Sequence, residues 1–563
     1  FGAGAIISNM IDGTITDFTG GTLSVWNGGK IVNFNNGNLS QIKTGNTITN
    51  MNGGVVADMI GGEITTMNDG EIASMSGGEI NNFNDGTVSE FNTGATIAIM
   101  TGGEITDFNG GTLSVWDGGK IINLNSGLLA IVKANNTIEN MLGGTITSMT
   151  GGEIGLMSDG LLETFSGGVI GEFAGGTITN FQNGTLNLWT NGVITNFKSG
   201  TLSFVGNNNT ITNMTGGNIT SMIGGNIDKM AGGTIASMTG GSISEFNDGA
   251  IINSLDGGTI TDFNNGALTN WNSGTITNFN NGNLATVKSG NIITNMIGGI
   301  ITNMTGGQID KVTGGTIDTF AGGTIDELNG GTINNIDGGT LNNWISGTIT
   351  NLRSGVLSLL KTGQTITNIY GGAITSMTGG TVTNMTGGTI GEITNGIIDY
   401  LDGGIITKLN GGTITDVNSG TISELASGTV GNVYGGEITT MNGGAVTSMS
   451  GGEIENLDGG TVADMIGGTV SSIDGGKIVA LTNGTVTALK SGEITEMGDA
   501  TVGTMSGGTI VELNDGRVGL VTGGTISSMV GGEIENLNGG TVTAMSNGVI
   551  TEMNNGNIGT VSD

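Results

Sequence analysis

Acidic side chains recur at fixed spacing along this 563-residue chain, and they are the first residues to consider for chemistry. Rows of carboxylates can recruit cations such as calcium. Two such rows are Glu63, Glu71 and Glu79, and Asp69 and Asp85. Glu453 and Glu455 are close enough in sequence to suggest an acid–base pair, but both occupy ordinary polar positions of a repeat. Solvated charge explains such pairs better than catalysis, so no catalytic, cofactor or metal-binding residue is assigned.

The residue types that the chain lacks narrow the chemistry further. Without cysteine, the chain forms neither disulfides nor thiolate metal sites. Without histidine, it lacks the usual general base and the commonest ligand of transition metals. The sequence therefore predicts a protein that is not an enzyme and that needs no cofactor, with calcium as the one ion to consider.

Tryptophan and lysine mark five similar passages, which we call the Trp passages. Each opens on a repeat that contains Trp, continues through two more repeats, and ends in a repeat of nine residues. The tryptophans are Trp26, Trp116, Trp189, Trp271 and Trp344, and four passages carry a lysine before the nine-residue repeat: Lys43, Lys133, Lys288 and Lys361. The tryptophans share their position with Met and Phe, which favours a place in the core over a sugar-stacking surface. The lysines could offset nearby carboxylates or remain plain solvated charges.

The charge balance restricts the partners. Against 47 acidic residues there are only 14 basic ones, giving a formal net charge of −33. Such a surface disfavours nucleic acid and anionic lipid, and it keeps a long β-rich protein soluble. No apolar run approaches the roughly 20 residues of a membrane span. No secretory signal is visible, and the opening on Phe1 leads us to expect a processed or partial chain.

The elements that must position these residues are short repeats. From Asp12 to Ser562 the chain consists of 61 repeats of eight residues (octads) and seven of nine (nonads). Gly143 to Thr150, with the sequence GGTITSMT, is a typical octad. An unbroken period this short predicts a β-solenoid, in which each coil contacts only its neighbours. A ladder that uses every backbone N–H also explains the absence of proline.

Each octad predicts one short strand and one turn. Position 2 is glycine in nearly every repeat, which predicts a positive φ; asparagine replaces it at Asn135 and Asn208. Ala500 is the remaining exception and should mark an altered turn or a strained residue. Positions 4 and 7 are apolar. A straight strand would point them to opposite faces, so we expect a bend that turns both inward, the alternative being an outward apolar stripe at position 7.

The number of octads in one coil is left open between two and three. Two octads, a 16-residue coil, are easier to fill from two apolar residues per octad and are favoured. Glu63 would then lie over Glu79; in a 24-residue coil it would lie over Thr87. Stacked carboxylates should be partly protonated, splayed or bridged by cations. The nonads should be outward bulges, because the octad phase resumes directly after them.

The organisation along the chain has three parts. Residues 1–11 form a lead-in, residues 12–370 carry the Trp passages and all the nonads, and residues 371–563 form a uniform octad array. The change near 370 is one of pattern, without a linker. No terminal cap is evident, and a partner could supply one.

The glycine-rich octads resemble the repeat regions of bacterial surface adhesins and of phage fibres, an architectural resemblance that covers the whole chain. It implies an extracellular fibre or stalk segment on a cell or virion, which self-associates or attaches to a larger assembly. The glycine rhythm is also similar to the GGxGxDxUx nonads of calcium-binding secreted toxins, although the fixed Asp is missing. Thr-x-Thr pairs such as Thr145 and Thr147 resemble those of ice-binding solenoids. A ligand-binding solenoid for calcium, then ice or glycan, is therefore the alternative function.

Overall fold

The computed structural model describes residues 1–562 and divides the chain into two compact units. The N-terminal unit is Phe1–Gly282 and the C-terminal unit is Asn283–Asp563. All regular structure in the described residues is β-strand, as the repeats predict. Within that same part of the chain, no helix has the length and hydropathy to cross a membrane.

The strands of the N-terminal unit are β1 (Ile6–Ile7), β2 (Thr14–Leu23), β3 (Gly29–Ile42), β4 (Asn46–Phe83), β5 (Thr87–Phe91), β6 (Thr96–Met100), β7 (Glu104–Phe108), β8 (Thr112–Trp116), β9 (Gly119–Leu124), β10 (Leu128–Val132), β11 (Asn136–Met141), β12 (Thr145–Met157), β13 (Leu161–Phe173), β14 (Thr177–Phe181), β15 (Thr185–Trp189), β16 (Gly192–Phe197), β17 (Thr201–Val205), β18 (Asn209–Asn247), β19 (Ala250–Asn264) and β20 (Ala267–Asn281).

The strands of the C-terminal unit are β21 (Asn283–Val287), β22 (Asn291–Met296), β23 (Ile300–Val312), β24 (Thr316–Ile336), β25 (Thr340–Leu352), β26 (Val356–Leu360), β27 (Thr365–Ile369), β28 (Ala373–Met385), β29 (Thr389–Val433), β30 (Glu437–Met441), β31 (Ala445–Met449), β32 (Glu453–Leu457), β33 (Thr461–Met465), β34 (Thr469–Leu481), β35 (Thr485–Met497), β36 (Thr501–Met505), β37 (Thr509–Leu513), β38 (Arg517–Val521), β39 (Thr525–Met529), β40 (Glu533–Leu537), β41 (Thr541–Met545), β42 (Val549–Met553) and β43 (Asn557–Val561).

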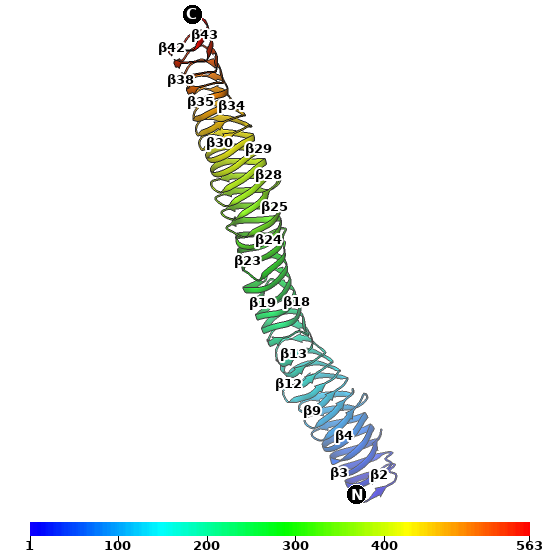
Figure 1. Ribbon diagram of the computed structural model, residues 1–563. Coiled ribbons are helices and arrows are strands. Elements are labelled where there is room, and N and C mark those ends of the chain that lie inside the picture. Colours follow the sequence, from blue (N-terminus) through cyan, green and yellow to red (C-terminus); the bar gives the residue numbers. More distant parts are fainter. Residues whose placement is uncertain (563) are drawn as a thin grey trace. The chain divides into compact units, whose positions relative to one another are not determined.

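The strands pair in parallel with partners one coil away, and one coil is two octads long. Ile146 in β12 pairs with Leu162 in β13, sixteen residues further on, and the offset becomes seventeen across a nonad. Within each unit the strands stack one above the next (Figure 1). The two units together contain about 35 turns of about 16 residues. The favoured 16-residue coil is therefore confirmed, and the 24-residue alternative is wrong.

The core is a continuous stack of the side chains at positions 4 and 7. In one octad Ile146 and Met149 are both 0 % exposed, and Trp271 at position 7 is 4 % exposed. Strand partners are formed at positions 3, 4, 6 and 7 and are skipped at position 5, where the strand bends. The inward bend is confirmed and the outward apolar stripe is excluded, because both side chains could not otherwise be buried.

Turns at position 2 have the expected left-handed backbone in nearly every repeat, as at Gly144 with a φ of 75°. The prediction of a positive φ was wrong at Asn135 and Asn208, because Asn265 is the only non-glycine residue in the described chain with a positive φ. Asn135 lies in a longer turn. A hydrogen bond from the Asn136 N–H to the Lys133 carbonyl oxygen, at 3.0 Å, joins the two ends of this turn. That turn needs no left-handed residue. At Ala500 the turn is altered, as predicted: its N–H donates to the Gly498 carbonyl oxygen at 2.8 Å.

Position 1 of the turn is glycine or a side chain that can cap the turn. A Cβ on Gly143 would lie 2.3 Å from the carbonyl oxygen of Asn125 in the coil below, so glycine is required there. In some of the repeats with Asp or Asn at position 1, the side-chain oxygen of this residue accepts a hydrogen bond from the N–H of position 2. Asp69 accepts from Gly70 at 2.7 Å in this way, and Asp85 accepts from Gly86 at 2.8 Å.

Side chains on the outside of the coils form ladders along the stack. One ladder consists of Asn35, Asn52, Asn68, Asn84 and Thr101, in which each side chain donates to the one in the coil before it, at 2.9 to 3.0 Å. Ion pairs follow the same spacing. Lys311 lies 3.0 Å from Glu327, and Lys477 lies 2.9 Å from Glu493, in each case across sixteen residues. Neighbouring coils are thus joined on the outside as well as through the backbone.

Candidate functional site

Several of the carboxylates that the sequence singled out are hydrogen-bonded to neighbours inside the protein. The Glu63 carboxylate accepts from the Asn81 side-chain amide at 2.6 Å, and Asp69 caps its own turn. Glu453 accepts from the Ser471 hydroxyl at 2.6 Å. Among residues 1–562 there is no group of three or more Asp or Glu side chains that could hold a metal ion. Calcium binding therefore stays a prediction without a defined site.

Stacked carboxylates do occur, and they are splayed. Glu437 pairs in register with Glu453 in the next coil. The Glu437 carboxylate accepts from the Thr439 hydroxyl at 2.9 Å, whereas that of Glu453 turns toward Ser471 in the following coil. The two negative charges thereby find different partners, one of the three outcomes expected for such a stack.

Three ionisable groups have pKa values that their neighbours shift. The Asn272 amide, followed by the Ser254 hydroxyl, donates to Asp256 and lowers the pKa of that carboxyl. The Lys477 ammonium, helped by the Thr495 hydroxyl, lowers the pKa of Glu493. Glu139, hydrogen-bonded to Lys120, raises the pKa of Lys120. Each of the three groups bonds to a side chain in a neighbouring coil, so these shifts reflect the stacking of coils.

The Trp passages hold the main irregularity of the coil. All five tryptophans are buried in the core, as predicted. In the second, third and fifth passages, the strand that ends in Trp is not paired with the strand one coil further on. In the second passage, β8 pairs backward with β6, and β10 pairs forward with β12. In the third passage β15 and β17 are likewise not paired with each other. In the fifth passage the same is true of the first half of β25 and β26. We call these three places the open ladder sites.

A side-chain amide bridges the missing backbone bond in the third and fifth passages, and in the second passage an amide accepts the equivalent N–H. In an ordinary coil the N–H at position 8 donates to the carbonyl of position 7 one coil earlier, as Asn125 does to Phe108 at 2.9 Å. In the third passage the Gly206 N–H donates instead to Asn209 Oδ1 at 2.6 Å. The Asn209 amide nitrogen then donates to the Trp189 carbonyl oxygen at 3.3 Å. We call this inserted amide the amide rung.

The amide rung recurs with the same spacing from Trp. In the fifth passage the Lys361 N–H donates to Gln364 Oε1 at 2.6 Å, and the Gln364 amide nitrogen donates to the Trp344 carbonyl. In the second, the Lys133 N–H donates to Asn136 Oδ1 at 2.6 Å. The rung residue always follows its tryptophan by 20 residues and is buried, with Asn136 1 % exposed.

The opposite face of the same coils remains closed. Opposite the opening in the second passage, β9 pairs with β11, and the Asn140 side chain donates to that of Asn123 at 3.0 Å. In the third passage β16 pairs with β18 in the same manner, with Asn213 donating to Asn196 at 3.3 Å. The inserted residue of the nonad lengthens the turn that links the open face to the closed face. Each open ladder site is therefore a wedge, open on one face of the solenoid only.

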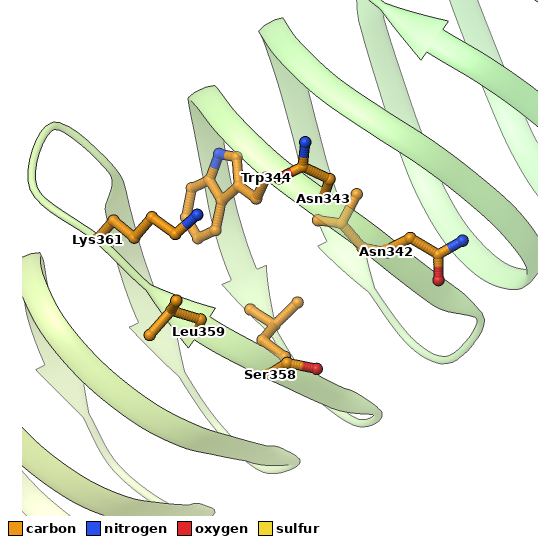
Figure 2. A pocket seen from close by; sticks show the side chains of 8 residues that line it. Asn342, Asn343, Trp344, Ser358, Leu359 and Lys361 are labelled. Carbon is orange, nitrogen blue, oxygen red and sulfur yellow. The ribbon is translucent and has the colours of Figure 1, made fainter.

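A cavity lies between the two separated strands at each open ladder site. The cavities of the second and fifth passages measure about 220 Å³ and that of the third about 260 Å³. Figure 2 shows the fifth, with Trp344 on one strand, Ser358 and Leu359 on the other, and the Lys361 side chain directed toward the Trp344 ring. None of the three cavities is lined by a carboxylate. In a chain of net charge −33, these are uncharged or locally positive places.

Two buried polar groups in the second passage have no hydrogen-bond partner among the described residues. They are the indole nitrogen of Trp116 and the amide nitrogen of Asn136. The indole nitrogen of Trp344 in the fifth passage is also without a partner. In the third passage, by contrast, the Trp189 indole donates to the Asn191 carbonyl oxygen at 3.0 Å. Buried donors without partners are costly, and the first passage, whose ladder is closed, holds another in the amide nitrogen of Asn46.

The nonads are not outward bulges, which corrects the prediction. The inserted residue points inward in six nonads with Asn or Ala: Asn46, Ala95, Asn136, Asn209, Ala250 and Asn291 are all nearly fully buried, and Gln364 is equally buried in the seventh. Only an amide side chain can act as a rung. Beside Ala95 the Asn92 N–H donates directly to the Met75 carbonyl at 2.8 Å, and β5 stays paired with β4. An alanine nonad therefore leaves the ladder closed.

The sequence did carry a signal for the open ladder sites that composition alone does not reveal. Position 4 is usually Ile or Val, but both strands of each opening have Leu there, as at Leu113 and Leu129. Paired leucines, Trp, and an amide residue 20 positions after the Trp occur at all three sites, but they do not suffice to open the ladder. The first passage has the same combination and keeps the pairs Thr22 with Asn38 and Leu23 with Leu39. The lysines of the passages form no ion pair within residues 1–562; Lys133 and Lys361 instead line cavities.

Comparison with known proteins gives no match, neither to a family model, nor to a curated protein, nor to a solved structure.

Proposed function

We propose that this chain is a structural segment of an extracellular fibre or stalk, carried by a cell surface or a virion, with no chemistry of its own. The observation that carries this proposal is the repetition of one bonded coil through each unit. Outside the open ladder sites, each coil adds a similar core layer and the same backbone ladder bonds, as Ile146 over Leu162 illustrates. A structure of this kind gains length without needing a larger core.

The outer ladders support a load-bearing role. Ladder hydrogen bonds and ion pairs such as Lys311 with Glu327 join each coil to the next on the outside. The net charge of −33 opposes side-by-side aggregation of such a segment. Attachment is expected through other parts of an assembly, or through lengthwise association of copies.

Two measurements test the proposal. Immunogold electron microscopy on the producing cells or particles should place the chain outside, on a projecting structure; a purely intracellular signal would contradict it. In addition, deletion of residues 437–500, which removes four coils from the uniform array, should shorten the isolated molecule by roughly 19 Å at about 4.8 Å per coil. A matched deletion of 60 residues, which breaks the coil period, should instead cause misfolding.

A further inference from the structure

We propose that the three tyrosines of the chain form a binding row for a neutral, β-1,4-linked polysaccharide. This inference goes beyond the fibre role and does not depend on it. The residues are Tyr370, Tyr400 and Tyr434, the only tyrosines in the sequence. They are 52 %, 44 % and 56 % exposed, whereas all five tryptophans are buried. We call them the tyrosine row; it lies in the C-terminal unit, around β28 and β29 (Figure 1).

The strand register places Tyr400 two coils beyond Tyr370. Tyr370 directly follows β27, at position 8 of its nonad. Asn368, at position 6 of the same nonad, pairs with Asn384, and Asn384 pairs in turn with Tyr400. Because each pairing advances the chain by one coil, the two tyrosines are separated by about 9.6 Å along the stack.

Tyr434 continues the row after two more coils. Asp402 stands at position 8 of the octad that contains Tyr400, and the Asn418 side chain donates to it from the next coil at 2.6 Å. The Tyr434 N–H donates to the carbonyl oxygen of Val417, the residue before Asn418, at 2.8 Å, so Tyr434 lies one coil further still. A tyrosine thus recurs at every second coil, over a span of about 19 Å.

An extended β-1,4-linked chain of pyranose sugars has the matching period. Each sugar advances the chain by nearly the height of one coil and is turned over relative to the sugar before it. Every second sugar therefore presents the same face to a surface, just as every second coil presents a tyrosine. A tyrosine ring offers an apolar face to the C–H groups of a sugar and a hydroxyl for hydrogen bonding. The tyrosines alternate between positions 8 and 6, so a chain lying along position 7 is about one residue length, roughly 3.3 Å, from each of them.

Polar side chains between the tyrosines suit a ligand that is rich in hydroxyl groups. Asn418 donates to Asp402 in the row at position 8, and Asn432 donates to Asp416 at 2.7 Å in the row at position 6. Each of these amides has a second N–H and an oxygen to offer a ligand. The two carboxylates disfavour an acidic polysaccharide, and the net charge of −33 disfavours a second copy of this chain as the occupant. The charges therefore select a neutral polysaccharide.

The test is isothermal titration calorimetry of the full-length chain with hexasaccharides. Cellohexaose and chitohexaose, both neutral and β-1,4-linked, are the probes, and at least one of them should bind saturably. Maltohexaose, whose α-1,4 linkages curl the chain, should bind more weakly by at least about tenfold. Tyr400→Ala should weaken binding of the favoured probe by about tenfold, as expected for the loss of one stacking contact. Tyr400→Phe keeps the ring and should bind nearly as tightly as the native protein.

An added coil tests the spacing of the row without removing any side chain. A second copy of residues 411–426, inserted after residue 426, places Tyr434 three coils beyond Tyr400. Tyr434 would then meet a sugar that is turned over, and affinity should fall about as far as in Tyr434→Ala. The matched control is a second copy of residues 443–458 inserted after residue 458, which adds one coil beyond the row and should bind like the native protein. Both insertions keep the octad phase, so circular dichroism should show the native strand spectrum.

Four results would overturn the proposal. The first is the absence of saturable binding of either β-1,4-linked hexasaccharide to the native chain. The second is native affinity in Tyr400→Ala or in the variant with the coil added inside the row, which would place the binding elsewhere. The third is equal binding of maltohexaose. The fourth is self-association of the native chain that Tyr400→Ala abolishes, measured by sedimentation velocity, which would make a second copy the occupant.

Discussion

At the scale of single residues, the two glycines of each turn serve different purposes. Gly144 has a left-handed backbone, while Gly143 avoids a clash with the coil below. Gly144→Val should destabilise the protein by at least about 1–2 kcal/mol, because a branched side chain strongly disfavours that conformation. Chemical denaturation monitored by circular dichroism would measure the change. Thr147→Val, at an outward strand position of the same octad, is the control and should be nearly neutral; equal losses would contradict the turn argument.

The shifted carboxyl pKa values predict a dependence on pH. Asp256 has its pKa lowered by Asn272 and Ser254, so its ladder bonds contribute stability above the usual carboxyl range of about 4. This contribution is lost as the pH falls through the lowered pKa. Melting temperatures of native protein and Asp256→Asn, compared between pH 7 and pH 2, should therefore converge toward low pH. A difference that stays constant over this range would show that the charge of Asp256 contributes nothing.

At the scale of elements, the asparagine ladders should contribute measurable stability. Asn68 donates to Asn52 and accepts from Asn84, at 2.9 Å in both cases. Asn68→Ala removes both bonds and should cost about 1–2 kcal/mol. Urea denaturation would measure this loss. Asn52→Ala in an Asn68→Ala background should then add less than it does alone, because the two residues share a bond; strict additivity would argue that the ladder bonds are not formed in solution.

The two kinds of nonad should also tolerate deletion differently. Deleting Ala95 removes a residue that contributes one short turn bond, while deleting Asn136 also removes the rung that satisfies the Lys133 N–H. Thermal unfolding should show a larger loss for the Asn136 deletion. A larger loss for the Ala95 deletion would indicate that the backbone length of the turn matters more than the amide.

The sequence predicts the regular elements well and the irregular ones poorly, for a physical reason. A pattern repeated 68 times averages out local exceptions, so the strands, the turn glycines and the buried positions 4 and 7 are all confirmed. The prediction of an outward bulge at the nonads was wrong, because an asparagine such as Asn136 would ordinarily lie at the surface but is buried here. Its burial depends on a bond to the backbone N–H of Lys133, three residues earlier in the same turn, which spacing alone does not express.

At the scale of the molecule, the charge dominates. A chain with net charge −33 contains stacked carboxylates such as Glu496 with Glu512, and each bare pair at about 5 Å repels by roughly 1 kcal/mol. Sodium chloride should therefore raise the melting temperature by screening. A chelator should leave it unchanged, as expected for a structural protein without bound calcium. A drop with the chelator that calcium reverses would instead establish a specific cation site.

The uniform array should fold by itself. Residues 371–562 contain only octads, and beyond the first coil each is stacked on octads of the same array, as Glu437 on Thr421 shows. A fragment of residues 371–563 should retain the strand spectrum of the full chain, since each coil needs only its neighbours. Far-ultraviolet circular dichroism and limited proteolysis would check this. An unfolded fragment would mean that the Trp-marked part is needed to start the stack.

The wedge shape of the open ladder sites bears on how straight the N-terminal unit remains. From Trp116 to Trp189 there are eight octads and one nonad, an odd number of repeats. Because two repeats make a turn, the openings of the second and third passages lie on opposite faces. Each opening widens the strand spacing on its own face only, and so tilts the coils that follow it. The two tilts have opposite directions, so the N-terminal unit can accommodate both openings without a lasting bend.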